Sequence, residues 1–196
     1  MNGETRITSL KSDRFSTRAL LTFVVLGALG AIIVHVSRIL GVALQATVPW
    51  LAFPAPVPWF LGILIAALLI QRSGAALLTS IVTTVAGFGA LALCAGIVIE
   101  LTFFITRRLR SQTQPTWPPA RSQFWLWWAI LACAIVSLMS FGFMFFYQEF
   151  LLLDPSIKLL ALIIRVGLGV LYGWGAWVMT IGLLRANVNP QRIVVA

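Results

Sequence analysis

Long apolar runs with almost no charged residue fill the sequence between residues 17 and 185, and they constrain the fold more than any other feature. Charged residues make up 10% of the 196 residues, whereas an ordinary soluble domain carries roughly a quarter. In lipid, every backbone N–H and C=O must find a partner inside the protein, which favours helices. The alternating polarity of barrel strands is absent. The sequence therefore predicts an all-α, polytopic protein of the cell membrane.

The apolar runs divide into a bundle of about six predicted transmembrane helices within one membrane domain, 17–185, between tails 1–16 and 186–196. A hydrocarbon core of about 30 Å needs about 20 helical residues. The runs 57–71 and 74–88 are shorter than this, so two alternatives stay open for them. They form either two crossings, which we favour, or a re-entrant hairpin. The predicted helices are 17–38, 57–71, 74–88, 89–106, 123–147 and 156–184.

The formal net charge is +9, and the basic residues lie at the helix ends rather than on one face. That placement argues against a nucleic-acid partner and places most of them on one side of the bilayer. The positive-inside rule then predicts that the N-terminus and the C-terminus are both cytoplasmic. Residues 39–56, rich in proline, become an outer loop that can act as a lid, and Asp154-Pro155 predicts a helix N-cap.

The sequence lacks the motifs of several common enzymatic and metal-binding sites. There is no G-x-x-x-x-G-K-[ST] phosphate loop, so the chain is not expected to hydrolyse ATP by that route. One histidine, no paired Cys or His ligands and no G-x-S-x-G motif leave too few parts for a metal site or a nucleophilic triad. We therefore expect no enzyme, no metal and no cofactor.

Two ionisable residues, Glu100 and Arg165, interrupt the apolar runs at a predicted depth of roughly 16 and 14 Å from the outer helix ends. A charge near the midplane costs several kcal/mol, so both are expected to face the bundle interior or a wet cavity. One interpretation is a structural ion pair between them. The other is that one or both bind a polar or charged ligand, in which case Glu100 favours a cation.

Aromatic residues gather near the predicted outer side. Trp50 and Trp59 flank the proline-rich segment and Tyr147 ends the fifth predicted helix, a density that suits a pocket for a flat ring. The alternative is lipid-facing packing with an interfacial belt. His35 is a further candidate for the site, or an interfacial anchor. At the other side, Trp125, Trp127 and Trp128 predict an aromatic interface belt.

A family resemblance adds to these observations. Its motifs are Arg72-Ser73-Gly74-Ala75-Ala76-Leu77, then Gly96, Glu100-Leu101 and Arg107, and then the run 162–165 that ends in Arg165. In this order they resemble the YkoE-like S components of energy-coupling-factor (ECF) transporters. The resemblance implies a six-helix subunit that captures a vitamin on the outer side, by family default thiamine or its hydroxymethylpyrimidine precursor. It also implies partners: a transmembrane coupling subunit driven by two ATPase subunits.

In that group, docking on the coupling subunit commonly uses small residues of the first helix, because close approach of two backbones needs them. Here the resemblance implies docking at Gly27 and Ala31, or at a second small-residue face that includes Gly169 and Gly173. The leading hypothesis is thus a substrate-capture subunit with a vitamin ligand. The alternative is a non-transporting membrane scaffold or assembly protein in which Glu100 and Arg165 hold helices together.

Overall fold

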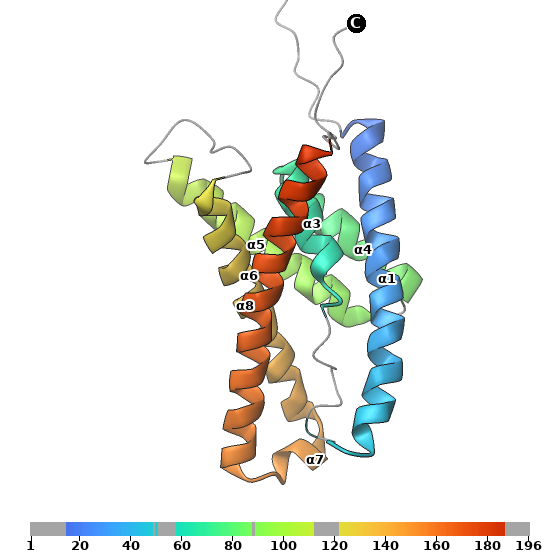
Figure 1. The fold of residues 1–196 in the computed structure, drawn as a ribbon, viewed down its shortest axis with the longest axis vertical. Helices are drawn as coiled ribbons and strands as arrows, with labels where there is room; N and C mark the ends of the chain where they lie inside the picture. The colour runs from blue at the N-terminus through green and yellow to red at the C-terminus, as the bar shows by residue number, and fades with distance from the viewer. Residues whose placement is uncertain (1–14, 49, 51–57, 88, 112–121, 187–196) are drawn as a thin grey trace, which may run out of the picture.

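The fold is seen in a computed structural model that describes residues 15–48, 50, 58–87, 89–111 and 122–186. Every regular element in these residues is helical, as the sequence predicts (Figure 1). The elements are α1 (Thr17–Gln45), α3 (Leu61–Ile70), α4 (Ala75–Gly87), α5 (Ala90–Ser111), α6 (Gln123–Phe143), the 3-10 helix η1 (Met144–Phe146), α7 (Gln148–Leu151) and α8 (Pro155–Arg185).

Four of the described helices are long and apolar enough to cross a membrane: α1, α5, α6 and α8. The helices α3 and α4 have 10 and 13 residues, which at 1.5 Å per residue gives about 15 and 20 Å. Both are shorter than the hydrocarbon core. The chain is thus a multi-pass membrane protein by length and composition, while the crossing of α3 and α4 stays a prediction.

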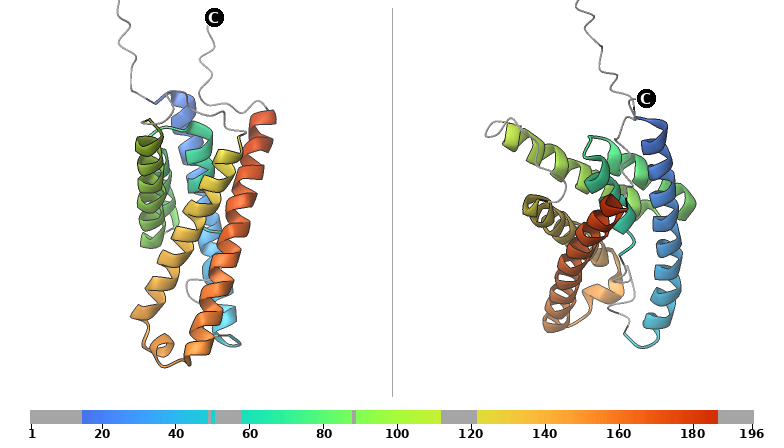
Figure 2. Two further views of the ribbon diagram at one scale, coloured as in Figure 1. Left: turned by 90° about the vertical axis from the view of Figure 1, so that its left-hand side faces the viewer. Right: turned by 45° about the horizontal axis from the view of Figure 1, so that its top comes forward.

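The two ends of the bundle differ (Figures 1 and 2). The helix α1 begins and α8 ends at the same end, which we call the termini end, and α7 lies at the opposite, distal end. The helices α6 and α8 run antiparallel to one another, and α3 and α4 lie in the half nearer the termini. Among the described residues, the distal half is therefore built from α1, α6 and α8, with η1 and α7 between α6 and α8.

The short helix α3 lies at the centre of the termini half. All its residues from Gly62 to Ile70 are buried, and it contacts α1, α4, α5, α6 and α8. A helix that is apolar on every side needs such surroundings, because it has no polar face to present to water. The apolar composition of α3 is thus explained by its central, buried position within the protein.

Small residues bring the helices into close contact. A Cβ atom on Gly27 would lie 2.6 Å from Val82 Cβ, and Thr83 Oγ1 of α4 donates to the Gly27 carbonyl oxygen at 3.1 Å. Between α6 and α8, a Cβ atom on Gly173 would lie 2.7 Å from Ile130 Cα. Close backbone approach of this kind is typical of membrane helix interfaces.

Several predicted helix ends are corrected by the structure. The predicted helix 89–106 continues as α5 to Ser111, and the predicted helix 57–71 begins at Leu61 as α3. The first helix was expected to end at residue 38, but α1 continues to Gln45, because no proline interrupts the chain before residue 49. Part of the predicted loop 39–56 is therefore helical, and residues 49 and 51–57 lie outside the described residues. The fifth predicted helix, 123–147, is α6 to Phe143 followed by η1.

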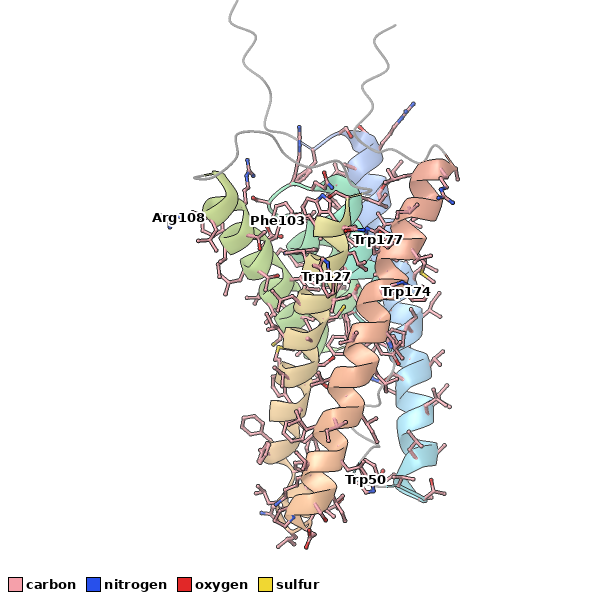
Figure 3. The ribbon with its side chains drawn as sticks, turned by 60° about the vertical axis from the view of Figure 1, so that its left-hand side comes forward. Trp50, Phe103, Arg108, Trp127, Trp174 and Trp177 are labelled. Carbon is pink, nitrogen blue, oxygen red and sulfur yellow. The ribbon has the colours of Figure 1, made fainter. Side chains whose placement is uncertain are left out.

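The predicted tryptophan belt is also corrected. Trp125 and Trp128 are buried with Phe103, whose ring centroid lies 6.0 and 5.9 Å from theirs. Of the three tryptophans only Trp127, which is 67% exposed, points outward (Figure 3). Aromatic rings that stack on one another bury large apolar areas, so two of the three serve the core of the termini half.

Candidate ligand-binding site

The buried charge of the distal half is Arg165. It lies on α8 about 15 Å from Pro155 and about 30 Å from Arg185. Its side chain is 4% exposed, and Nη1 donates a hydrogen bond of 3.1 Å to Ser140 Oγ of α6. Because side chains of a helix lean toward its N-terminus, the guanidinium points toward the distal end. The position fits the prediction that Arg165 faces the bundle interior.

An aromatic and aliphatic group, the distal cluster, lies on the distal side of Arg165. Ala161, one turn earlier on the same face of α8, belongs to it. Trp50, one of the predicted site residues, packs against this cluster at the distal end (Figure 3). The full distal cluster is Met144, Phe150 and Ala161, with Trp50, Phe141 and Leu153 packed against them.

A second aromatic group, the central ring group, lies on the other side of Arg165. Tyr172 is seven residues further along the same face of α8, and its ring centroid lies 6.2 Å from that of Phe60. Trp59, another predicted site residue, is edge-on to Phe60 at 5.2 Å and is buried. The central ring group is Trp59, Phe60 and Tyr172. Arg165 thus lies along α8 between two aromatic groups.

Glu100 occupies a different place. Its Oε1 accepts a hydrogen bond of 2.5 Å from the backbone N–H of Gly74, at the start of α4. Gly74 has a φ of +92°, which favours glycine. On the same turn, Arg107 of α5 donates to Ser73 Oγ at 3.3 Å. A carboxylate at a helix N-terminus is stabilised by the helix dipole, so Glu100 fixes the turn between α3 and α4.

The two predicted midplane charges therefore contact different elements: Glu100 the α3–α4 turn, and Arg165 helix α6. The depth expected for Glu100 assumed an upright helix, whereas α5 runs obliquely through the termini half (Figures 1 and 2). Three residues that carry the family resemblance, Gly74, Glu100 and Arg107, come together here with Ser73. The sequence order alone did not indicate that they form one hydrogen-bonded group.

The remaining predicted residues are on the periphery. His35 Nε2 lies 3.3 Å from the Ala86 carbonyl oxygen, so the side chain joins α1 to the end of α4. Tyr147 is 44% exposed beside α7 at the distal end, and partial burial raises the pKa of its hydroxyl. Asp154 caps α8 as predicted. The Ser156 hydroxyl and backbone N–H both donate to its carboxylate and lower its pKa.

The four small residues predicted to dock a partner are covered by the chain's own helices. Gly27 and Ala31 are buried on the face of α1 that packs on α4. Gly169 and Gly173 are buried against α6, and a Cβ atom on Gly169 would lie 3.1 Å from the Cys133 carbonyl oxygen. Surface that is filled within the chain is not open to another protein, so these residues stabilise the bundle.

Sequence reasoning missed Ser140 and Tyr172. A serine in an apolar run opposite a buried arginine was the available signal for Ser140, but its use required knowing that α6 and α8 are antiparallel neighbours. Within the described residues, no group of three or more His, Cys, Asp and Glu side chains is placed to hold a metal ion. The distal half thus has one buried guanidinium with an aromatic group on each side of it along α8.

Comparison with known proteins places the fold. No family model and no curated protein matches the sequence. The structure is similar to a solved one described as the crystal structure of an S-component of ECF transporter, with a TM-score of 0.70 and 20% sequence identity. The similarity covers 92% of this chain and 91% of that chain. The protein is thus a multi-pass helical membrane protein with the fold of an ECF transporter S component.

Proposed function

We propose that this chain is the membrane-embedded, substrate-binding S component of an ECF-type importer. The observation that carries the proposal is the fold similarity to an S component over 92% of the chain. The distal half supports it independently, because the buried Arg165 lies between two aromatic groups. A mostly apolar site with few polar groups is typical of small-molecule binding.

The proposed orientation follows from charge. Arg18, Arg72, Arg107 and Arg185 all lie near the termini end of the bundle. The distal end carries the acids Glu149 and Asp154 and one base, Lys158. The positive-inside rule makes the termini end cytoplasmic. The distal half, with Arg165, then opens toward the outside of the cell membrane, where an importer meets its ligand.

The proposed partners are a transmembrane coupling subunit and two ATPase subunits. The chain lacks a phosphate-binding loop, so energy for transport has to come from another subunit. Since the small residues of α1 and α8 pack within the chain, docking is proposed to use exposed apolar helix faces instead. Val24, Val25 and Ile32 of α1 supply one such face.

The proposed ligand class is a vitamin, and the family resemblance favours thiamine or hydroxymethylpyrimidine. Trp59 lies in the central ring group and Trp50 in the distal cluster, so a ligand between them would alter tryptophan fluorescence. Glu100 is engaged at Gly74, so we assign it a structural role in place of the cation-binding role considered from the sequence.

The proposal is tested with the full chain purified in lipid nanodiscs. Tryptophan fluorescence is titrated with thiamine, hydroxymethylpyrimidine and a panel of other vitamins, and the purified protein is analysed for bound vitamin by mass spectrometry. We expect saturable binding of one vitamin and co-purification of an ATPase pair from the native membrane. Absence of any saturable response and of any bound vitamin would reject the capture function in favour of the scaffold alternative.

A further inference from the structure

We propose that the guanidinium of Arg165, together with the Ser140 hydroxyl, binds an anionic group of the captured ligand, a carboxylate or a phosphate. This inference rests on the proposed function, because it names the chemical class of that ligand. It assigns the polar end of the ligand to the contact between α6 and α8.

The chemistry of Arg165 supports an anion. Arginine stays charged at every physiological pH, and its planar fork of N–H donors matches the two oxygens of a carboxylate or phosphate. The side chain is 4% exposed, so a charge there is far less screened than on a surface. A bound anion adds a stronger interaction to the neutral hydrogen bond with Ser140. Charged side chains within a bilayer typically mark such functional sites.

The position of Arg165 along α8 supports a small, ring-bearing ligand. Ala161 of the distal cluster is about 6 Å away along the helix axis, and Tyr172 of the central ring group is about 10 Å away. All three lie on one face of the helix. A ligand of vitamin size can therefore place its acid at Arg165 while its ring lies against Tyr172 or the distal cluster.

The helices that hold the site are closely fixed to one another. One turn from Arg165, Gly169 leaves room for the Ser137 side chain, which approaches the α8 backbone there. Ser137 and Ser140 lie three residues apart on α6, and both are buried. A rigid scaffold of this kind holds a binding group in a fixed orientation. The Ser140 hydroxyl then orients the Arg165 guanidinium toward the ligand.

The placement of Glu100 removes the reason to expect a cationic ligand. Its carboxylate binds the Gly74 amide in the termini half, whereas Arg165 lies in the distal half. Among the buried side chains of the described residues, the charged one is Arg165, and its charge is positive. Among thiamine compounds, the inference favours a phosphorylated form over the cation thiamine itself.

The test uses matched pairs that differ only in the acid. Nanodisc-embedded full chain is titrated with thiamine monophosphate and thiamine, nicotinate and nicotinamide, biotin and biotinamide, and pantothenate and pantothenol. We expect the acid of one pair to bind at least about tenfold more tightly than its partner, the size of one charge-assisted contact. The pair that responds distinguishes phosphate from carboxylate.

Variants assign the preference to the site. In Arg165→Gln the ratio of affinities within the responding pair is expected to fall toward one, while Arg165→Lys keeps part of it. Ser140→Ala is expected to lower the ratio by several-fold, and Arg185→Gln, a change at the far end of the same helix, leaves it unchanged. If Arg165→Gln does not fold, Ser140→Ala decides.

The outcomes separate this inference from the proposed function. Saturable binding of a vitamin with equal affinity for acid and neutral partner, or an unchanged ratio in Arg165→Gln or Ser140→Ala, overturns the anion site and leaves the capture function standing. A response to none of the compounds, with no vitamin bound as purified, overturns both.

Discussion

Replacing Glu100 by glutamine tests whether this residue is structural. In the structure its carboxylate accepts the Gly74 N–H at 2.5 Å and faces the positive end of the α4 dipole. Glutamine keeps the shape and one acceptor oxygen but removes the charge. We therefore expect Glu100→Gln to lower the free energy of unfolding without changing the affinity for any ligand of the distal half.

The magnitude follows from the two interactions lost. A hydrogen bond to a charged group contributes about 1.5–3 kcal/mol, and a charge at a helix N-terminus adds about 0.3–1 kcal/mol. Glu100→Ala removes both and should cost about 2–4 kcal/mol, and Glu100→Gln about 1 kcal/mol. For a chain of this length, 1 kcal/mol lowers Tm by about 2–4 °C.

The assay uses a thiol the chain already has. Cys133 is fully buried and Cys94 is partly exposed, so in a Cys94→Ala background a thiol-reactive fluorescent dye reports the exposure of Cys133 on heating. Glu149→Gln, a change at an exposed acid of the distal end, is the matched control and should leave Tm unchanged. The reasoning is refuted if Glu100→Gln leaves Tm unchanged and weakens ligand binding tenfold, because that result would place the carboxylate in the ligand site.

Three further predictions follow. Gly173→Ala places a methyl group 2.7 Å from a backbone atom of α6 and should destabilise the protein by about 1–3 kcal/mol, whereas Gly175→Ala, with open space around it, should be neutral or stabilising in the same thermal assay. Asp154→Asn should remove a stabilisation that is present above the ordinary carboxyl pKa of 3.8 and is lost as the pH falls through the lowered folded-state pKa. Trp59→Phe should reduce the ligand-induced fluorescence change, whereas Trp174→Phe, on the lipid-facing surface, should not.

Each of these has a contradicting outcome. Equal melting temperatures of the Gly173 and Gly175 variants would mean that α6 and α8 are not in close backbone contact. An identical pH dependence of unfolding in Asp154→Asn between pH 2 and 5 would contradict the cap, because a depressed pKa must link proton uptake to unfolding. An unchanged ligand response in Trp59→Phe would place the ring of the ligand at the distal cluster.

Much of the local structure follows from sequence pattern. The helices 74–88 and 156–184 were predicted to within a residue of α4 and α8, because each is bounded by strong local signals: Gly74 before α4, and Asp154-Pro155 before α8. The end of α1 was missed because the helix continues past Arg38 and through Gly41, with no proline before residue 49. A charge within an apolar run was taken as a helix end, but a long helix that extends past the hydrocarbon core carries charges without stopping.

The sequence did not predict which residues contact one another in the folded chain. Glu100 and Arg165 were placed at similar depths by counting residues from helix ends, and only the oblique course of α5 shows that Glu100 belongs to the α3–α4 turn. Gly27 and Gly173 are small residues of the kind expected at a docking surface. Only the structure shows that they pack against α4 and α6 of the same chain. Ser140 became a candidate only through its contact with Arg165.

The sequence by itself determined that this chain is a bundle of membrane helices. Its apolar runs are long, and in lipid a helix satisfies the backbone N–H and C=O groups within each run. The sequence also determined which residues are costly to bury. The tertiary structure decided what each of those residues does, because the contacts of a buried charge depend on the tilt and neighbours of its helix. In this protein one such charge, Glu100, caps a helix, and the other, Arg165, lies buried between two aromatic groups, where we propose that it binds the ligand.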